Sequence, residues 1–168
     1  TNPKALTGGA GTDTLTISET VSTLDTTSSL TDHSVTGFET LEVKGVAATG
    51  ATADVSHTVA VDKFTGLTAL KATVDNNDSA ASDGNGEDVA VNLTGIGTQS
   101  ISFTADASAV ANNDESIALT LKDDTGASDV VNITSAQPTS GKVNQLTELK
   151  LNRSSNVANA IVETVNLT

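Results

Sequence analysis

The chain has 168 residues and no stretch with the composition of a long flexible linker, so we expect one elongated domain spanning residues 1–168. Its net charge of −13 excludes nucleic acid and anionic membrane surfaces as natural partners. The absence of cysteine excludes disulfides and thiolate metal sites, and a total of three phenylalanines argues against a wide aromatic core.

No apolar run is long enough for a transmembrane helix, so we do not expect insertion into a membrane. The sequence opens on Thr1 without a start methionine or a signal peptide. We therefore interpret it as a piece of a longer polypeptide, in which case the missing signal says little about export.

The first predicted element is a glycine-rich turn followed by a strand. From Gly8 the sequence reads GGAGTDTLT, which matches the nonapeptide GGxGxDxUx of calcium-binding RTX β-rolls at every position. Glycines let the backbone turn tightly, so we expect the carbonyls of Gly8 and Ala10 and the carboxylate of Asp13 to bind Ca²⁺. A neighbouring coil would supply further ligands, with Asp25 and Asp32 as candidates. The alternative is a glycine-rich hairpin loop before an ordinary strand.

A five-residue theme then predicts strands along the chain: an acid, Thr or Val, an aliphatic residue, a polar residue and a second aliphatic residue. It begins at Asp13, Glu39, Asp129 and Glu163. Looser alternating segments are 67–74, 88–93, 100–104, 116–121 and 148–151. Alternation with period two and frequent Val and Thr indicate short strands, and the unequal spacing of the theme is typical of coils with loop insertions.

Two architectures accommodate this pattern. In a right-handed parallel β-solenoid each coil stacks on the one before and buries rows of small aliphatic side chains. In an antiparallel β-sandwich the same alternation would serve two facing sheets. The repeated theme and the nonapeptide favour the solenoid.

Two further segments could hold calcium. In the segment 83–88 the residues Asp83, Asn85 and Asp88 offer oxygen ligands, and two glycines occupy the positions equivalent to those of the first turn. An EF-hand is excluded there because Asp88 occupies the sixth position, where that loop needs glycine. Asp129 follows an acidic turn in the same way but lacks most of the glycines, so a simple turn before a strand remains the alternative there.

Catalytic signals are weak. His33 and His57 are isolated from any cluster of carboxylates in the sequence, so we expect surface or hydrogen-bonded histidines rather than ligands or bases. No nucleophile elbow, phosphate-binding loop, dinucleotide fingerprint or zinc-protease motif is present. We do not expect an enzyme.

Three segments together resemble a known family. The turn from Gly8, the strand Gly37–Val43 and the ending Val162–Thr168 resemble RTX-type surface-layer (S-layer) proteins of Gram-negative bacteria, as does the scarcity of Cys, Met and aromatic residues. The chain departs from a full β-roll because it lacks tandem nonapeptides, which predicts scattered calcium sites rather than a continuous row.

The resemblance implies type I secretion, attachment to the outer cell surface and calcium-dependent assembly of identical copies into a lattice. Outer-surface polysaccharide would be bound through another region of the protein. The alternative role is a repeat or passenger module of a secreted RTX adhesin that binds a host or matrix surface.

Overall fold

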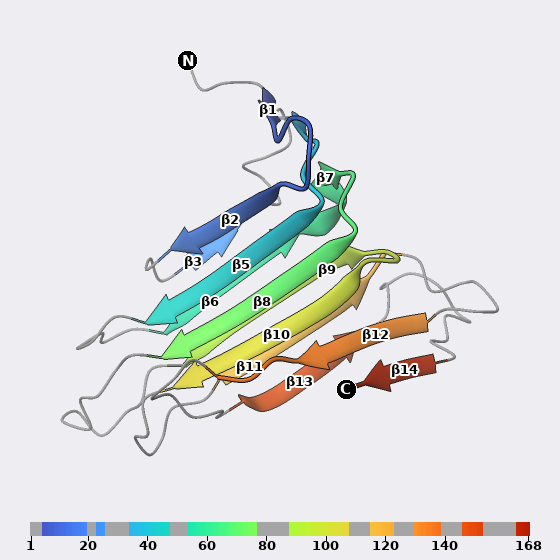
Figure 1. Ribbon diagram of the computed structural model, residues 1–168. Coiled ribbons are helices and arrows are strands. Elements are labelled where there is room, and N and C mark those ends of the chain that lie inside the picture. The colour runs from blue at the N-terminus through green and yellow to red at the C-terminus, as the bar shows by residue number, and fades with distance from the viewer. Residues whose placement is uncertain are drawn as a thin grey trace.

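The computed structural model arranges the chain as a flattened parallel β-solenoid (Figure 1). The structure describes residues 5–19, 23–25, 34–47, 54–76, 88–107, 115–122, 130–138, 146–152 and 164–168. Strand neighbours within the described sheets run parallel to one another. The expected solenoid is therefore confirmed, and the antiparallel sandwich is wrong.

The described strands form three sheets. The six-stranded sheet contains, in spatial order, β14 (Thr164–Leu167), β12 (Val130–Ser135), β10 (Ser100–Ala107), β8 (Ala69–Asn76), β5 (Thr40–Ala47) and β2 (Thr14–Glu19). The five-stranded sheet contains β13 (Leu146–Asn152), β11 (Glu115–Leu121), β9 (Val89–Ile96), β6 (Val55–Ala60) and β3 (Thr23–Asp25). The three-stranded sheet contains β1 (Ala5–Thr7), β4 (Ser34–Thr36) and β7 (Phe64–Thr65), and a 3₁₀ turn, η1 (Val61–Lys63), precedes β7.

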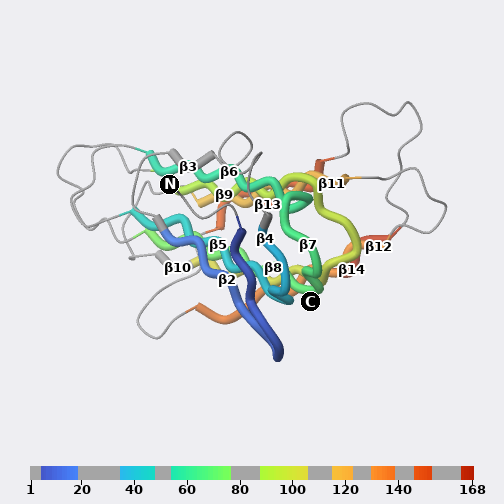
Figure 2. Tube along the Cα trace, turned by 90° about the horizontal axis from the view of Figure 1, so that it is seen from above, coloured from blue at the N-terminus to red at the C-terminus, as the bar shows by residue number. Residues whose placement is uncertain are grey.

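The two larger sheets lie face to face as two layers. Seen along the stack, β3, β6 and β9 lie in one layer, and β2, β5 and β8 lie in the other (Figure 2). The arrows of the two layers point in opposite directions, because the chain runs along one layer and returns along the other (Figure 1). The three-stranded sheet occupies the corner through which the first coils pass before they enter the six-stranded sheet.

Copies of the five-residue theme occupy equivalent positions in stacked coils of the solenoid. Thr14 pairs with Thr40 in the ladder between β2 and β5, so one turn of the solenoid takes 26 residues here. At the other end of the sheet Val130 pairs with Thr164, with a separation of 34 residues. Copies of the theme therefore stack in register although the coils differ in length.

The core consists of aliphatic rows that run across the strands. One row crosses all the strands of the six-stranded sheet: Leu15, Leu41, Leu70, Ile101, Ile133 and Leu167. The middle members of the row are buried, and a buried side chain of this size contributes about 1.5–3 kcal/mol. Alternation along each strand thus produces a thin core that needs few aromatic residues.

Among the residues that the structure describes, three polar ones are buried within this core, namely His57, Asn76 and Glu115. His57 is 0% exposed and projects from β6 toward β5, where a Cβ added to Gly45 would lie 3.3 Å from His57 Cδ2. The missing side chain at Gly45 makes room for the imidazole between the layers. His57 is therefore an interior residue of the solenoid, whereas His33 lies outside the described residues.

Candidate metal site

The glycine-rich turn lies at the corner between the three-stranded and six-stranded sheets. β1 stacks on β4 in register, so Gly8 follows directly on a paired strand and donates its N–H to the carbonyl of Thr36 at 3.0 Å. A Cβ on Gly8 would lie 2.0 Å from the carbonyl oxygen of Gly37, which is closer than any real Cβ contact. Only glycine allows the two coils to approach this closely.

The rest of the nonapeptide forms an exposed loop. Gly9–Thr12 intervene between Gly8 and Asp13, whereas in the next coil Phe38 alone separates Gly37 from Glu39. Gly9 and Gly11 adopt φ of 103° and 130°, and nothing would crowd a Cβ on either of them. The loop includes Ala10 and extends outward from the stack, and the coil regains its register at Asp13.

Asp13 and Glu39 meet where this loop ends. The N–H of Asp13 donates to Glu39 Oε2 at 2.7 Å, and the carbonyl of Asp13 accepts from the N–H groups of Glu39 and Thr40, each at 3.1 Å. Asp13 Oδ2 is buried and has no hydrogen-bond partner. The carboxylate of Glu39 is thereby held at the backbone of Asp13 in the preceding coil, and one carboxylate oxygen of Asp13 is left without a hydrogen-bond partner.

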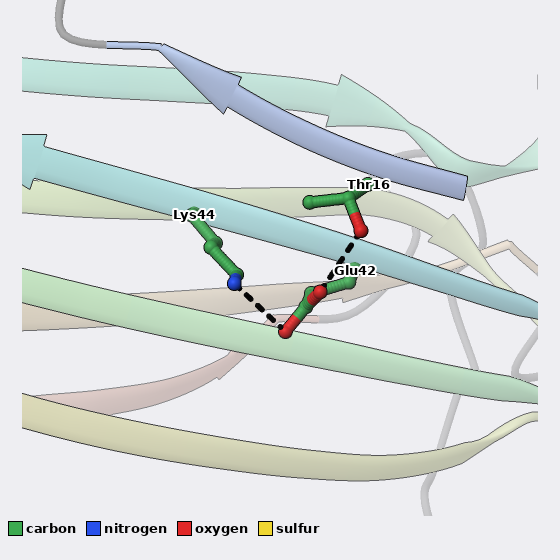
Figure 3. Close-up of polar contacts among 3 residues, drawn as sticks. All are labelled: Thr16, Glu42 and Lys44. Atoms are coloured by element: carbon green, nitrogen blue, oxygen red, sulfur yellow. Dashed lines mark hydrogen bonds and ion pairs between the residues drawn. The ribbon is translucent and has the colours of Figure 1, made fainter. Parts of the chain in front are cut away.

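No basic residue in the described part of the chain forms an ion pair with either of these carboxylates. Glu42 lies in β5, three residues after Glu39, and differs in this respect. Its carboxylate accepts from Thr16 Oγ1 at 2.9 Å and lies 3.4 Å from Lys44 Nζ (Figure 3). Glu42 is thus paired on the solvent face, whereas Asp13 and Glu39 have no counter-ion among the residues that the structure describes.

Asp88 belongs to a separate corner. It precedes β9 in the five-stranded sheet, and its N–H donates to Oδ1 of Asp54, which precedes β6. Its carbonyl accepts from the N–H of Val55 at 2.8 Å. The carboxylate of Asp54 thus accepts from the backbone N–H of Asp88, just as the carboxylate of Glu39 accepts from the backbone N–H of Asp13. Unlike Asp13 and Glu39, both Asp54 and Asp88 are exposed.

The remaining predicted ligands cannot be placed. Asp83, Asn85 and Asp129 lie outside the described residues, as does Asp32. Asp25 ends β3 in the five-stranded sheet. The structure thus brings Gly8, Ala10 and Asp13 into one turn and leaves their relation to these other residues as a prediction.

No protein family, curated protein or solved structure matches the chain.

The described residues contain no cluster of three or more His, Cys, Asp and Glu side chains placed to hold a metal. They also contain no helix with the length and apolar character needed to cross a membrane. Among the described residues, two carboxylates and backbone carbonyls are the groups that could hold an ion at the corner of Asp13 and Glu39.

Sequence reasoning missed two acids in these corners, Glu39 and Asp54. Glu39 begins a copy of the five-residue theme. That theme predicts the strand that follows Glu39, but it does not predict Glu39 itself as a ligand. The stacking of one theme on the next places Glu39 directly beside Asp13. Asp54 precedes β6. This strand has fewer apolar residues at its alternate positions than the predicted strands do, so the sequence did not mark Asp54 as an acid that precedes a strand.

Proposed function

We propose that the chain is a structural module of a calcium-dependent bacterial surface layer, secreted to the outer cell surface and assembled there from identical copies. The observation that carries the proposal is the corner formed by Asp13 and Glu39. It combines a buried carboxylate oxygen that lacks a partner with a second carboxylate and a nonapeptide of the calcium-binding type.

The donor set of this corner fits calcium. Asp13, Glu39 and the carbonyls of Gly8 and Ala10 offer oxygen ligands only, and Ca²⁺ accepts about six to eight oxygens in flexible geometry. Zinc and copper favour imidazole and thiolate, which the described corner does not offer. A bound Ca²⁺ would neutralise the two carboxylates and hold one coil against the next.

The composition supports a structural role outside the cell. A thin aliphatic core without disulfides benefits from an additional cross-link, and extracellular calcium provides one without cysteine chemistry. A chain with net charge −13 repels its own copies until cations bind, so calcium would also promote assembly. We further propose type I secretion and anchoring to surface polysaccharide through another region, with no catalytic activity in this module.

The proposal predicts that calcium stabilises the fold through Asp13. At a free Ca²⁺ concentration of about 100 times Kd, binding to the folded state alone adds about 2.7 kcal/mol. For a domain of this size the gain corresponds to a rise in Tm of about 5–11 °C. Thermal unfolding followed by circular dichroism in calcium and in chelator measures the difference, and Asp13→Asn should abolish most of it.

Asp62→Asn is the matched control, because Asp62 is an exposed aspartate of η1 that lies outside the turn and its substitution removes the same charge. The control should keep the full effect of calcium on Tm, and Glu39→Gln should reduce it. Equal Tm values for the unsubstituted chain in calcium and in chelator would sink the proposal. A calcium effect that persists in Asp13→Asn would move the site away from the nonapeptide.

A further inference from the structure

The two outer faces of the solenoid differ in charge. In the six-stranded layer, the outward positions of β5 and β8 carry four charged side chains, Glu42, Lys44, Lys71 and Asp75. In the five-stranded layer, the partly exposed residues that alternate with the core in β6, β9 and β11 are Ser, Thr, Ala and Asn. A chain with net charge −13 thus has a smooth, uncharged face across these three strands.

The strand ladders arrange these short side chains in two columns that run along the stack. The first column contains Ser56, Ala90 and Ser116, and the second contains Thr58, Asn92 and Ala118. On β13 the same two columns continue with Glu148 and Lys150, which form an ion pair at 2.6 Å. The centre of the face is therefore neutral, and its charges lie toward β13.

This face forms one flank of the stack, because it is the outer side of a whole layer (Figure 2). Coils added before or after the described ones would lengthen the flank and would not cover it. Its character is therefore a property of the described strands and not of either end of the stack.

We infer that this face binds the same face of a second copy of the chain, about a two-fold axis that runs along the stack between the two copies. The rotation places β9 on β9 and β13 on β13, with the strands of the two copies antiparallel. The axis crosses each strand between the two columns. Each residue of the first column then faces a residue of the second column on the other copy.

The facing residues are complementary in this arrangement. Ala90 faces Asn92 of the second copy, so a small side chain leaves room for a larger amide. Glu148 faces Lys150 of the second copy, so each charge of the ion pair gains another opposite charge. The contact is thus self-complementary in both size and charge.

The composition of the face also favours docking. Interface centres are depleted of charged residues, and two copies with net charge −13 repel each other least where both are neutral. Ser, Thr and Ala also lose less side-chain freedom on contact than Lys or Glu would.

The size of the face fits a weak, repeated contact. Five strands and the six-residue length of β6 give a face of about 24 Å by 20 Å, so two copies would bury about 1,000 Å² in total. This area is at the lower limit for a specific interface, as expected for a contact that many copies share in a lattice.

The inference rests on the proposed assembly from identical copies, but its test needs no calcium, so the two can fail separately. Sedimentation velocity is measured in chelator and about 1 M sodium chloride, where the Debye length of about 3 Å removes long-range repulsion. A concentration-dependent dimer should appear. Thr58→Asp should weaken this dimer at least about tenfold, because it places a carboxylate in the closed contact.

Thr73→Asp is the matched control, because Thr73 is a partly exposed threonine on the outer face of β8, in the other layer. This control should dimerise normally. Equal weakening by both substitutions would show an effect of charge alone and would overturn the assignment to the five-stranded face.

Cross-linking tests the axis. The chain has no cysteine, so Asn92→Cys and Lys150→Cys each carry a single thiol, and a short bismaleimide should link each variant to its own copy. Thr73→Cys should not form a linked dimer. Linking of Asn92→Cys without linking of Lys150→Cys would overturn the axis along the stack. A chain that stays monomeric at every concentration in chelator and high salt would overturn the inference, whatever calcium does to Tm.

Discussion

At the scale of single residues, Gly8 decides how closely two coils can approach. A Cβ at this position would overlap the carbonyl oxygen of Gly37, and the contact is with backbone, which cannot move aside as a side chain can. We expect Gly8→Ala to lower the free energy of unfolding by about 1–3 kcal/mol, as overpacking of a rigid contact does. Urea denaturation in chelator measures this loss without a contribution from calcium.

Gly97→Ala is the comparison that isolates the contact. Gly97 is exposed, and the nearest atom to an added Cβ is Gln99 Oε1 at 3.5 Å, an ordinary van der Waals distance. Its substitution should change the free energy of unfolding by no more than about 0.5 kcal/mol. Equal losses at the two positions would mean that the close approach of the coils at Gly8 has no energetic consequence.

The sequence predicts one part of the candidate site, the glycine-rich turn, but not the part that the next coil contributes. The nonapeptide predicts the turn that contains Gly8, Ala10 and Asp13, because a local turn depends on the spacing of consecutive residues. Glu39 escaped because its role depends on which residue of the next coil stacks on Asp13. That register depends on the loop Gly9–Thr12. The sequence shows the length of this loop, but it does not show that the loop extends outward from the stack.

At the scale of elements, the aliphatic rows predict where a core substitution is costly. Leu70 is buried at the centre of its row, so Leu70→Ala should lower the free energy of unfolding by about 2–5 kcal/mol through lost burial and a residual cavity. Leu6→Ala, at an exposed edge, should cost about 0.5 kcal/mol or less. Urea unfolding of the two variants makes the comparison, and equal costs would contradict the row arrangement.

The strands expected from the five-residue theme and from the looser alternating segments are present, and the strands that were missed share a physical reason. The strands β1, β3, β4 and β7 have two or three residues each, too few for alternation to stand out. β6 is longer, but Ser56, His57 and Thr58 conceal its pattern, because His57 faces inward where an aliphatic residue is usual. The missing side chain at Gly45, on another strand, leaves the space that the buried imidazole of His57 occupies.

At the scale of the whole molecule, a stack in which each strand contacts its neighbours should lose structure from its ends. β5, β8 and β10 have strands on both sides and buried inner faces, whereas β14 has one neighbour among the described strands and is exposed. We expect the slowest amide hydrogen exchange in the central strands and faster exchange toward β1 and β14. Hydrogen exchange read by mass spectrometry on a dilute sample in chelator checks the gradient. Uniform protection would indicate a single cooperative unit.

The loop Gly9–Thr12 has a consequence for how such a chain can vary. It lengthens one coil at a corner, yet β1 still pairs with β4 before it and β2 with β5 after it. Additional residues at this corner therefore change the outside of the molecule while the ladders and the core rows stay as they are. A peptide epitope inserted between Ala10 and Gly11 should accordingly be displayed on the surface of an unchanged solenoid, while it interrupts the nonapeptide of the proposed calcium site.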